Sequence, residues 1–235
     1  MIQPTAETLA GIELFRELPA EQRKEIVKSC HAHQCAAKQQ IVSHADQSTD
    51  VYFIVSGQVR ATICSASGRE VTFRDLGPGE MFGDLSAIDG KPRSATVVAI
   101  VDSLVLSMSA GAYLNALRSH PEICMGALRE LAGLVRLLTD RIVEMSTLGV
   151  KNRIHAELLR LAQKGKKEDN AIVISPIPTH ANIASRVSTH REAVTRELNE
   201  LAHIGLVERR SGALVIKNVA RLQRMVEEVR SHQIS

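Results

Sequence analysis

The chain has 235 residues, of which 44% are hydrophobic and 23% are charged, and its formal net charge at pH 7 is +3. These are ordinary globular values, so they exclude a disordered or fibrous chain, and the mild charge alone does not indicate a nucleic-acid partner. No apolar run is long enough to span a bilayer and no signal-peptide core follows the first residue, so we expect no membrane partner. Four cysteines without a paired framework fit a reducing compartment, and we expect a cytoplasmic protein with two domains.

The first half of the chain reads as helices followed by short strands. Residues 5–30 are predicted to be helical, with Pro19 opening a second helix. Runs rich in β-branched and aromatic residues follow, separated by turns that contain glycine, at 51–55, 59–63, 71–73, 95–99 and 103–108. Many short strands with such turns predict a small antiparallel barrel or roll.

Two thiols and two imidazoles lie within six residues, at Cys30, His31, His33 and Cys35. Their spacing matches none of the usual zinc patterns, although metal ligation is an alternative. The pattern favours a helix end that leads into the first strand, and we expect no metal cofactor.

The stretch from Gly77 to Ala99 carries the strongest signal for a ligand. A short helical turn is predicted to begin at Gly83, which leaves backbone N–H groups free to face an anion. Arg93 and Ser94 add a guanidinium and a hydroxyl, which together suit one phosphate, and Asp84 is placed to hold a sugar hydroxyl beside it. The alternative is a hairpin whose Arg93 points to solvent. The predicted ligand-binding residues of this stretch are Gly83, Asp84, Leu85, Ser86, Arg93 and Ser94.

From Pro121 the spacing of apolar residues changes to alternating steps of four and three. This is the heptad pattern of a two-stranded coiled coil, and it predicts a helix that pairs with a second copy and ends near Gly149. The alternative is one amphipathic helix docked within its own chain. Thr139 lies one residue from the seam, where its hydroxyl could reach a purine. The predicted dimer seam is Leu128, Leu131, Val135, Leu138, Ile142 and Met145.

After Gly149 the chain reads as a helical domain with a hairpin. The predicted elements are helices at 150–163, 180–187 and 191–204, a charged loop at 165–170 and strands at 172–174, 206–208 and 214–216. Thr179 is predicted to cap the second of these helices, Gly205 to close the third, and a turn at 188–190 joins the two. This arrangement is a helix-turn-helix followed by a wing, with Arg209 and Arg210 near its tip and well placed for phosphates.

The polar side of the predicted helix at 191–204 offers groups that can read bases. Arginine can pair with guanine and glutamate can accept from cytosine, although Glu192 also suits a helix start and the arginines also suit surface ion pairs. A basic wing beside them favours base contact. The predicted DNA-binding residues are Thr179, His180, His190, Arg191, Glu192, Arg196 and Arg210.

The segments 79–80, 82–86 and 92–95 closely resemble the phosphate-binding cassette of cyclic-nucleotide-binding domains. With the C-terminal segment, the whole chain resembles a bacterial transcription regulator of the CRP/FNR family. The resemblance implies an α+β protein with a cyclic-nucleotide-binding β-roll at 1–120, a long coiled-coil dimerisation helix with a hinge at 121–149 and a winged helix-turn-helix at 150–235.

The resemblance also implies partners and ligand contacts. It implies a cyclic nucleotide as effector, with cAMP favoured and cGMP as the competitor, and DNA and RNA polymerase as partners of a homodimer. Asp84 stands where the family usually has glutamate, and Leu138 and Thr139 stand where its long helix offers two hydroxyl residues to adenine. The Arg191-Glu192-x-x-x-Arg196 pattern resembles the cyclic-AMP receptor protein branch, which implies a palindrome with TGTGA-like half-sites.

No nucleophile, base and orienting group stand at a recognised catalytic spacing, so we expect a protein that is not an enzyme. Two alternatives remain beside the nucleotide-gated regulator. One is a CRP/FNR-type regulator that responds to redox state, haem or a metal, and the other is a cyclic-nucleotide-dependent subunit that binds proteins.

Overall fold

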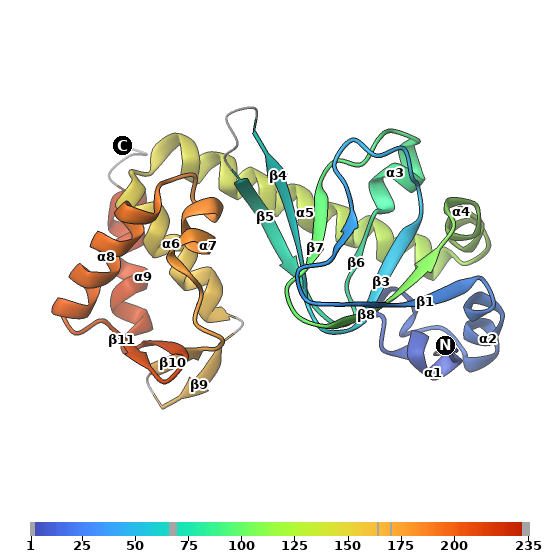
Figure 1. The fold of residues 1–235 in the computed structure, drawn as a ribbon, viewed down its shortest axis with the longest axis horizontal. Helices are drawn as coiled ribbons and strands as arrows, with labels where there is room; N and C mark the ends of the chain where they lie inside the picture. The colour runs from blue at the N-terminus through green and yellow to red at the C-terminus, as the bar shows by residue number, and fades with distance from the viewer. Residues whose placement is uncertain (1–2, 66–69, 164, 170, 232–235) are drawn as a thin grey trace. The chain divides into compact units, whose positions relative to one another are not determined.

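The computed structural model describes residues 3–65, 70–163, 165–169 and 171–231. The chain divides into two compact units, Met1–Val135 and Arg136–Ser235, and the division falls within one long helix. Figure 1 labels the helices and strands of both units. Each unit is described by itself below.

The first unit opens with α1 (Ala6–Ala10), a 3-10 turn η1 (Glu13–Phe15) and α2 (Ala20–Val27). The Thr5 hydroxyl accepts the Thr8 backbone N–H at 3.3 Å and the Thr8 hydroxyl accepts that of Thr5 at 3.1 Å, so α1 has a capping box. Pro19 directly precedes α2, which confirms a second helix there.

The helical region ends earlier than predicted, because residues 30–35 are a strand. Strand β1 (Cys30–Cys35) pairs antiparallel with β8 (Ser103–Met108), with Cys30 opposite Met108 and Cys35 opposite Ser103. The interpretation of this segment as a helix end was therefore wrong. Cys30 and Ala32 alternate toward the core, as the period of two in a strand requires, while the side chain of His31 is exposed.

Two antiparallel four-stranded sheets make the body of this unit, in the orders β1-β8-β3-β6 and β2-β7-β4-β5. An apolar cluster that includes Ile54, Val59 and Val105 lies between residues of the two sheets, which is the antiparallel roll predicted from the sequence. The remaining strands are β2 (Gln40–Val42), β3 (Val51–Ser56), β4 (Val59–Cys64), β5 (Glu70–Leu76), β6 (Met81–Phe82) and β7 (Thr96–Ala99).

Three further helices are described before α6: α3 (Asp84–Asp89), α4 (Ala110–Ser119) and α5 (Pro121–Thr147). Helix α5 starts at Pro121 as predicted and ends two residues before Gly149. Ile123 and Ala127 on its first turns are buried in the core of the first unit. Most of the predicted seam is exposed instead, including Val135 at 63% and Ile142 at 65%, and Leu131 is partly buried.

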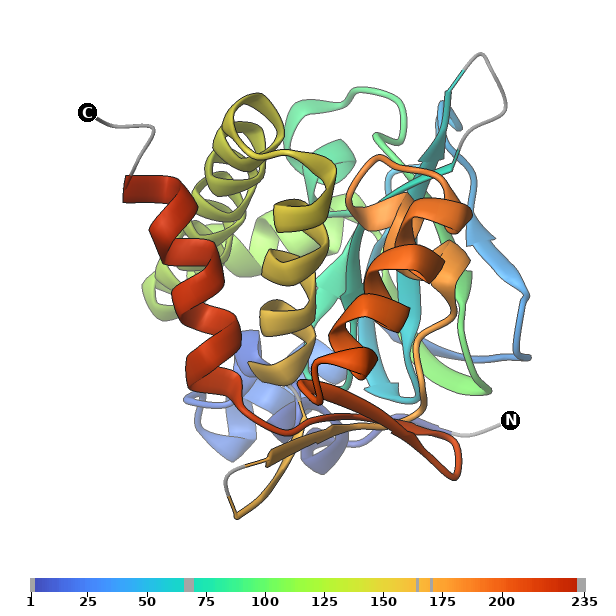
Figure 2. The same cartoon turned by 90° about the vertical axis from the view of Figure 1, so that its left-hand side faces the viewer.

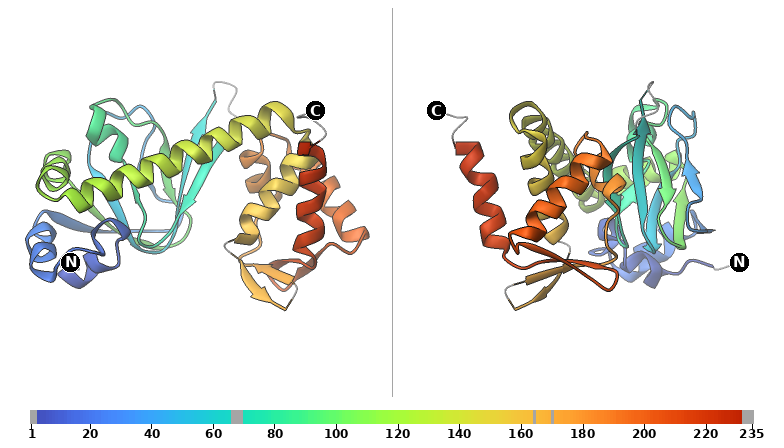
Figure 3. Two further views of the ribbon diagram at one scale, coloured as in Figure 1. Left: turned by 180° about the vertical axis from the view of Figure 1, so that it is seen from behind. Right: turned by 60° about the vertical axis from the view of Figure 1, so that its left-hand side comes forward.

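The second unit packs helices on one side of a small sheet (Figure 2). Helices α6 (Val150–Gln163) and α9 (Val219–Ser231) lie side by side (Figure 3), and the sheet has the order β11-β12-β10-β9. The core is apolar, with Ile154, Leu158 and Leu201 fully buried. The other elements are α7 (His180–Arg186), α8 (Arg191–His203), β9 (Lys166–Glu168), β10 (Ala171–Ile174), β11 (Val207–Arg210) and β12 (Ala213–Ile216).

The charged segment predicted as a loop at 165–170 contains a strand, so that prediction was wrong. Strand β9 pairs with β10, with Glu168 opposite Ala171 and Lys166 opposite Val173. Its side chains are all exposed on an edge strand, where charges are favoured because they discourage pairing with other chains. Asn170, at the end of the predicted loop, lies outside the described residues.

The helix-turn-helix forms as predicted. The Thr179 hydroxyl accepts the backbone N–H of Asn182 at 3.1 Å and so caps α7. Gly205 follows α8 with φ +70°, the left-handed conformation that glycine adopts freely after a helix. Among the described residues, no helix is both long and apolar enough to cross a membrane.

A buried ion-pair cluster ties the end of α5 to α6 and α7. The Glu157 carboxylate, 1% exposed, contacts the guanidinium of Arg160 and lies 3.4 Å from that of Arg186 and 3.7 Å from that of Arg141. Arg160 also contacts the buried Glu144. A buried carboxylate that several cations share stabilises the unit only while it stays charged.

Replacing Glu157→Gln leaves these guanidinium groups without their common anion. We expect the free energy of unfolding of the second unit to fall by about 3 kcal/mol. Urea unfolding followed by amide hydrogen exchange in α6 measures it. Glu168→Gln is the control, because the exposed Glu168–Arg210 pair at 3.8 Å contributes less than about 1 kcal/mol. An equal loss in both variants contradicts the prediction.

Candidate functional site

Gly83 shapes the start of α3. Its φ is +87°, and a Cβ at this position would lie 2.7 Å from both Arg93 Nη1 and the Asp50 carbonyl oxygen. Only glycine allows the chain to turn here and the guanidinium to approach so closely. The predicted helical turn is confirmed, and the backbone groups of Asp84 and Leu85 lie in its first turn beside Gly83.

Arg93 lies buried beside this turn, with only 3% of its surface exposed. Its Nη1 donates to the Gly83 carbonyl at 3.0 Å, its Nη2 to the Asp50 carbonyl at 2.8 Å and its Nε to the Ser48 hydroxyl at 3.0 Å. All three acceptors are uncharged, and none of the ion pairs among the described residues involves Arg93. The alternative of an Arg93 that points to solvent is therefore wrong. A buried cation that makes no direct ion pair favours an anionic ligand.

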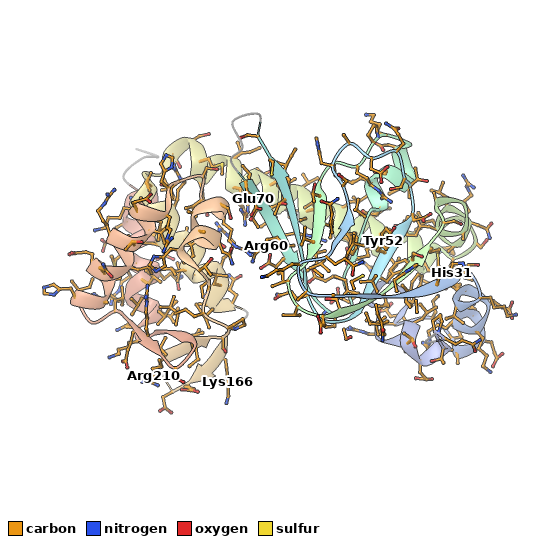
Figure 4. All side chains as sticks on the ribbon, viewed as in Figure 1. His31, Tyr52, Arg60, Glu70, Lys166 and Arg210 are labelled. Atoms are coloured by element: carbon orange, nitrogen blue, oxygen red, sulfur yellow. The ribbon has the colours of Figure 1, made fainter. Side chains whose placement is uncertain are left out.

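Aromatic rings support the guanidinium. The Tyr52 and Phe82 rings stack with centroids 5.0 Å apart and 9° between their planes, and Arg93 Cζ lies 5.9 Å from the Tyr52 centroid. Figure 4 labels Tyr52, which belongs to β3. A cation over an aromatic face is held by the electrostatic attraction of the ring. The sheet thus fixes the position of Arg93.

The loop at residues 43–50 holds the backbone of Arg93, which precedes β7, and the sequence did not indicate this contact. The backbone N–H of Arg93 donates to the Asp46 carbonyl at 2.8 Å, and that of Ala45 donates to the Arg93 carbonyl at 2.9 Å. The Asp46 carboxylate accepts from the Ser48 hydroxyl and backbone, and these hydrogen bonds lower the pKa of Asp46. Asp46 and Ser48 at this spacing signal a local turn, but no sequence pattern links the turn to Arg93.

Asp84 is largely buried, and burial raises the pKa of its carboxyl above its usual range. Its own backbone N–H, Arg74, the backbone N–H of Leu85 and Arg93 oppose this shift. Glu130 on α5 also has a raised pKa because of burial, again opposed by Arg74. Arg74 lies on β5 and donates to the Met81 carbonyl at 3.4 Å. Its positive charge lowers the pKa of both Asp84 and Glu130, two carboxyl groups that no sequence pattern connects.

Tyr113 on α4 adds a polar group to the same interior. Its side chain is fully buried, and its hydroxyl has no hydrogen-bond partner among the described residues. Burial and the charges of Asp84 and Glu130 raise the pKa of Tyr113. A buried hydroxyl without a partner is costly, so it fits an interior that a polar ligand or water completes.

The other predicted ligand residues differ in burial. Ser94 is exposed and Leu85 is 38% exposed, while Ser86 is buried within α3. Leu138 and Thr139 lie farther along α5, in the second unit, and remain predicted ligand residues.

The start of α8 presents exposed polar side chains to solvent. Arg191, Glu192 and Arg196 are exposed, and none of the ion pairs among the described residues involves them. His190 is also exposed and stands at the N-cap position without a side-chain capping bond. This leaves the polar groups of α8 available to a DNA duplex, as their predicted role requires.

The remaining predicted DNA contacts are already engaged within the protein. Arg210, which Figure 4 labels on β11, lies 3.4 Å from Glu208 and 3.8 Å from Glu168. The Thr179 hydroxyl caps α7, and both ring nitrogens of His180 contact other side chains. Contacts from these groups to DNA would have to replace or extend these interactions.

The cysteines of β1 lack the character of metal ligands. Burial raises the pKa of the Cys30 thiol to about 12 and raises that of Cys35 above its usual value. The described part of the chain holds no group of three or more histidine, cysteine, aspartate or glutamate side chains that could bind a metal ion. A buried thiol with a raised pKa is typical of a cysteine that packs as a small apolar side chain.

Comparison with known proteins agrees with this geometry. The family profile described as "Cyclic nucleotide-binding domain" matches residues 32–120, and the "Crp-like helix-turn-helix domain" matches residues 152–225. The chain is 31% identical over 175 residues to the CRP-like cAMP-activated global transcriptional regulator of Mycobacterium tuberculosis, a match that covers 74% of this chain and 78% of that protein. It is 31% identical over 188 residues to the cyclic AMP receptor protein of Thermus thermophilus, covering 78% and 82% of the two chains.

Among solved structures, the fold is similar to that of a CooA variant from Carboxydothermus hydrogenoformans, with a TM-score of 0.76. The two chains are 20% identical, and the match covers 86% of this chain and 90% of that chain. Fold and sites therefore define a DNA-binding regulator that carries a cyclic-nucleotide-binding domain. The chain belongs to the CRP/FNR family of transcription regulators, which confirms the resemblance seen in the sequence.

Gly83→Ala is expected to weaken binding of a cyclic nucleotide about tenfold or more, because the new methyl group would displace Arg93 and strain the left-handed backbone. Isothermal titrations with cAMP and with cGMP measure this. Gly90→Ala is a matched control, since Gly90 also has a positive φ of +69° but has no atom within 4 Å of an added Cβ. Equal losses in both variants would show that backbone strain alone matters.

Proposed function

We propose that the protein is a homodimeric transcription regulator gated by cAMP. The observation that carries this proposal is the buried Arg93 guanidinium, which meets only uncharged acceptors beside the first turn of α3. Three N–H bonds to the protein leave two of the five guanidinium donors for a phosphate. A cyclic phosphate would supply a direct anionic partner for the Arg93 guanidinium.

The proposed nucleotide uses the cassette residues in distinct roles. Arg93, Ser94 and the backbone N–H groups of residues 83–86 bind the phosphate, and Asp84 accepts from the ribose hydroxyl. Leu138 and Thr139, with the second subunit, close over the base. The two relatives described above are named for cAMP, which supports cAMP over cGMP as the effector.

Dimerisation is proposed through the seam of α5. Several seam side chains are large, apolar and exposed, among them Leu128 at 51% and Met145 at 40%. A row of such residues at heptad spacing is costly in water and is buried when a second copy of the helix packs against it.

DNA recognition is proposed through α8 and the wing. Arg191, Glu192 and Arg196 read a palindrome with TGTGA-like half-sites, while Thr179, His190 and Arg210 bind phosphates. Nucleotide binding stiffens α5 around residues 142–149 and sets the two recognition helices one turn of DNA apart. RNA polymerase is the proposed further partner, in the cytoplasm. We assign nucleotide binding to residues 1–120, dimerisation to 121–149 and DNA binding to 150–235, and we propose no catalytic role.

A second candidate is a CRP/FNR regulator with another effector. Arg93 already donates three hydrogen bonds to the protein. An effector that binds elsewhere would leave these hydrogen bonds intact, and this observation favours the second candidate. The helix-turn-helix match weighs against the protein-binding subunit.

A duplex carrying the TGTGA palindrome tests the gating at fixed salt, without nucleotide, with cAMP and with cGMP. Tight binding is expected only with nucleotide, and Arg93→Gln should raise the cAMP concentration needed about a hundredfold, because it removes charged hydrogen bonds to the phosphate. Lys91→Gln is the charge-matched control, since Lys91 lies two residues away and is exposed. Binding that ignores nucleotide would contradict the gating. Selection of a different duplex from a random library would contradict the half-site alone.

Val135→Asp places a charge in the seam and is expected to convert the dimer into a monomer in analytical ultracentrifugation. Val143→Asp serves as the control, because Val143 is 54% exposed and lies outside the seam. Persistence of the dimer in Val135→Asp would contradict pairing through α5.

A further inference from the structure

His180 connects the two DNA-facing elements of the second unit. It is the first residue of α7, and its Nδ1 lies 2.6 Å from the Thr195 hydroxyl on α8. Its Nε2 contacts Nη2 of Arg209 on β11. One imidazole therefore bridges the recognition helix and the wing strand.

The direction of these hydrogen bonds follows from the number of protons. The Thr195 hydroxyl has one proton, which it donates to the Arg191 carbonyl at 3.0 Å. It must therefore accept from His180, so Nδ1 carries the imidazole proton and Nε2 is left with a lone pair. Arg209 has only N–H donors, and Nε2 accepts from it. Both contacts are satisfied only by the neutral imidazole.

The charges around the ring favour the neutral form. Burial lowers the pKa of His180 below its usual value, and the positive charges of Arg209 on β11 and Arg191 on α8 lower it further. The imidazole is therefore neutral near pH 7, and protonation would remove the acceptor and repel Arg209.

The two arginines of the wing differ in their partners. Arg210 lies within 4 Å of two carboxylates, Glu168 and Glu208. Arg209 is exposed, and none of the ion pairs among the described residues involves it. Its contact with His180 uses one of five N–H donors and leaves its charge uncompensated, so the other donors remain free for a phosphate.

We propose that Arg209 is the principal phosphate-binding cation of the wing and that His180 is the positioning residue that holds it beside α8. The neutral imidazole orders Arg209 in the free protein, so less side-chain entropy is lost when DNA binds. The inference rests on the DNA-binding role of the helix-turn-helix and is independent of the effector.

The test uses the full chain and a mixed-sequence duplex of about 40 base pairs at about 50 mM salt, where phosphate contacts dominate binding. This probe needs neither the TGTGA half-site nor nucleotide, so failure of the proposed gating leaves the test unaffected. The variants are His180→Asn, His180→Gln, Arg209→Gln, Arg210→Gln and the double variant His180→Asn/Arg209→Gln. Asparagine places polar atoms near Nδ1 only, whereas the longer glutamine can place its oxygen near Nε2 and accept from Arg209.

At pH 7.5, Arg209→Gln should weaken binding about fivefold and reduce the salt slope by about one, and Arg210→Gln should have the smaller effect. His180→Asn should lose affinity, His180→Gln should restore most of it, and the double variant should bind no worse than Arg209→Gln. As the pH falls from 7.5 through the lowered pKa of His180, the loss caused by His180→Asn should shrink, because a protonated wild-type imidazole no longer has its acceptor.

Three results would overturn the proposal. Losses that multiply in the double variant would show that His180 and Arg209 act independently. Equal losses in His180→Asn and His180→Gln would show a role in folding or packing alone. Binding that strengthens at pH 5.5 in the wild type and in Arg209→Gln, but not in His180→Asn, would show that protonated His180 itself meets the phosphate.

Discussion

The buried charge of Arg93 is the constraint around which the ligand site is built. A guanidinium that is 3% exposed needs an acceptor for each nitrogen, and here the three acceptors come from two separate segments of the chain. The left-handed Gly83 turns its carbonyl toward the cation, and the 43–50 loop brings Ser48 and the Asp50 carbonyl. The turn at Gly83, the 43–50 loop and the segment that carries Arg93 thus depend on one another, although none of the three acceptors carries a charge.

The buried arginine clusters of the two units have different kinds of partner. In the second unit, Glu157 and Glu144 meet the arginines of α5, α6 and α7 directly, so positive charge there is compensated within the protein. Among the described residues of the first unit, Arg93 makes no direct ion pair and the Tyr113 hydroxyl has no hydrogen-bond partner. A folded domain stabilises itself by completing such groups. In the second unit, the buried ion pairs attach the end of α5 to the helix-turn-helix.

Local patterns predicted the elements well and the contacts between them poorly. Strand 103–108 and helix 150–163 have the predicted bounds, because alternation and helical periodicity act within a few residues. The strand at 30–35 was missed because its polar composition hides a pairing with a strand some seventy residues away. For the same reason the sequence predicted a ligand role for Arg93 but not the loop that holds it, which depends on tertiary contact alone.

The adjacent arginines of the wing, Arg209 and Arg210, also differ in contacts that no local sequence pattern predicts. Sequence alone cannot separate Arg209 from Arg210, since adjacent arginines beside a hairpin turn have the same local signal. Their side chains alternate across the strand, so one reaches Glu168 at the end of β9 and the other reaches His180 at the start of α7. An arginine already paired with carboxylates must exchange those partners to bind phosphate, whereas one ordered by a neutral imidazole gains its first anion. The partner of each cation, rather than its position near the tip, therefore decides which one DNA engages.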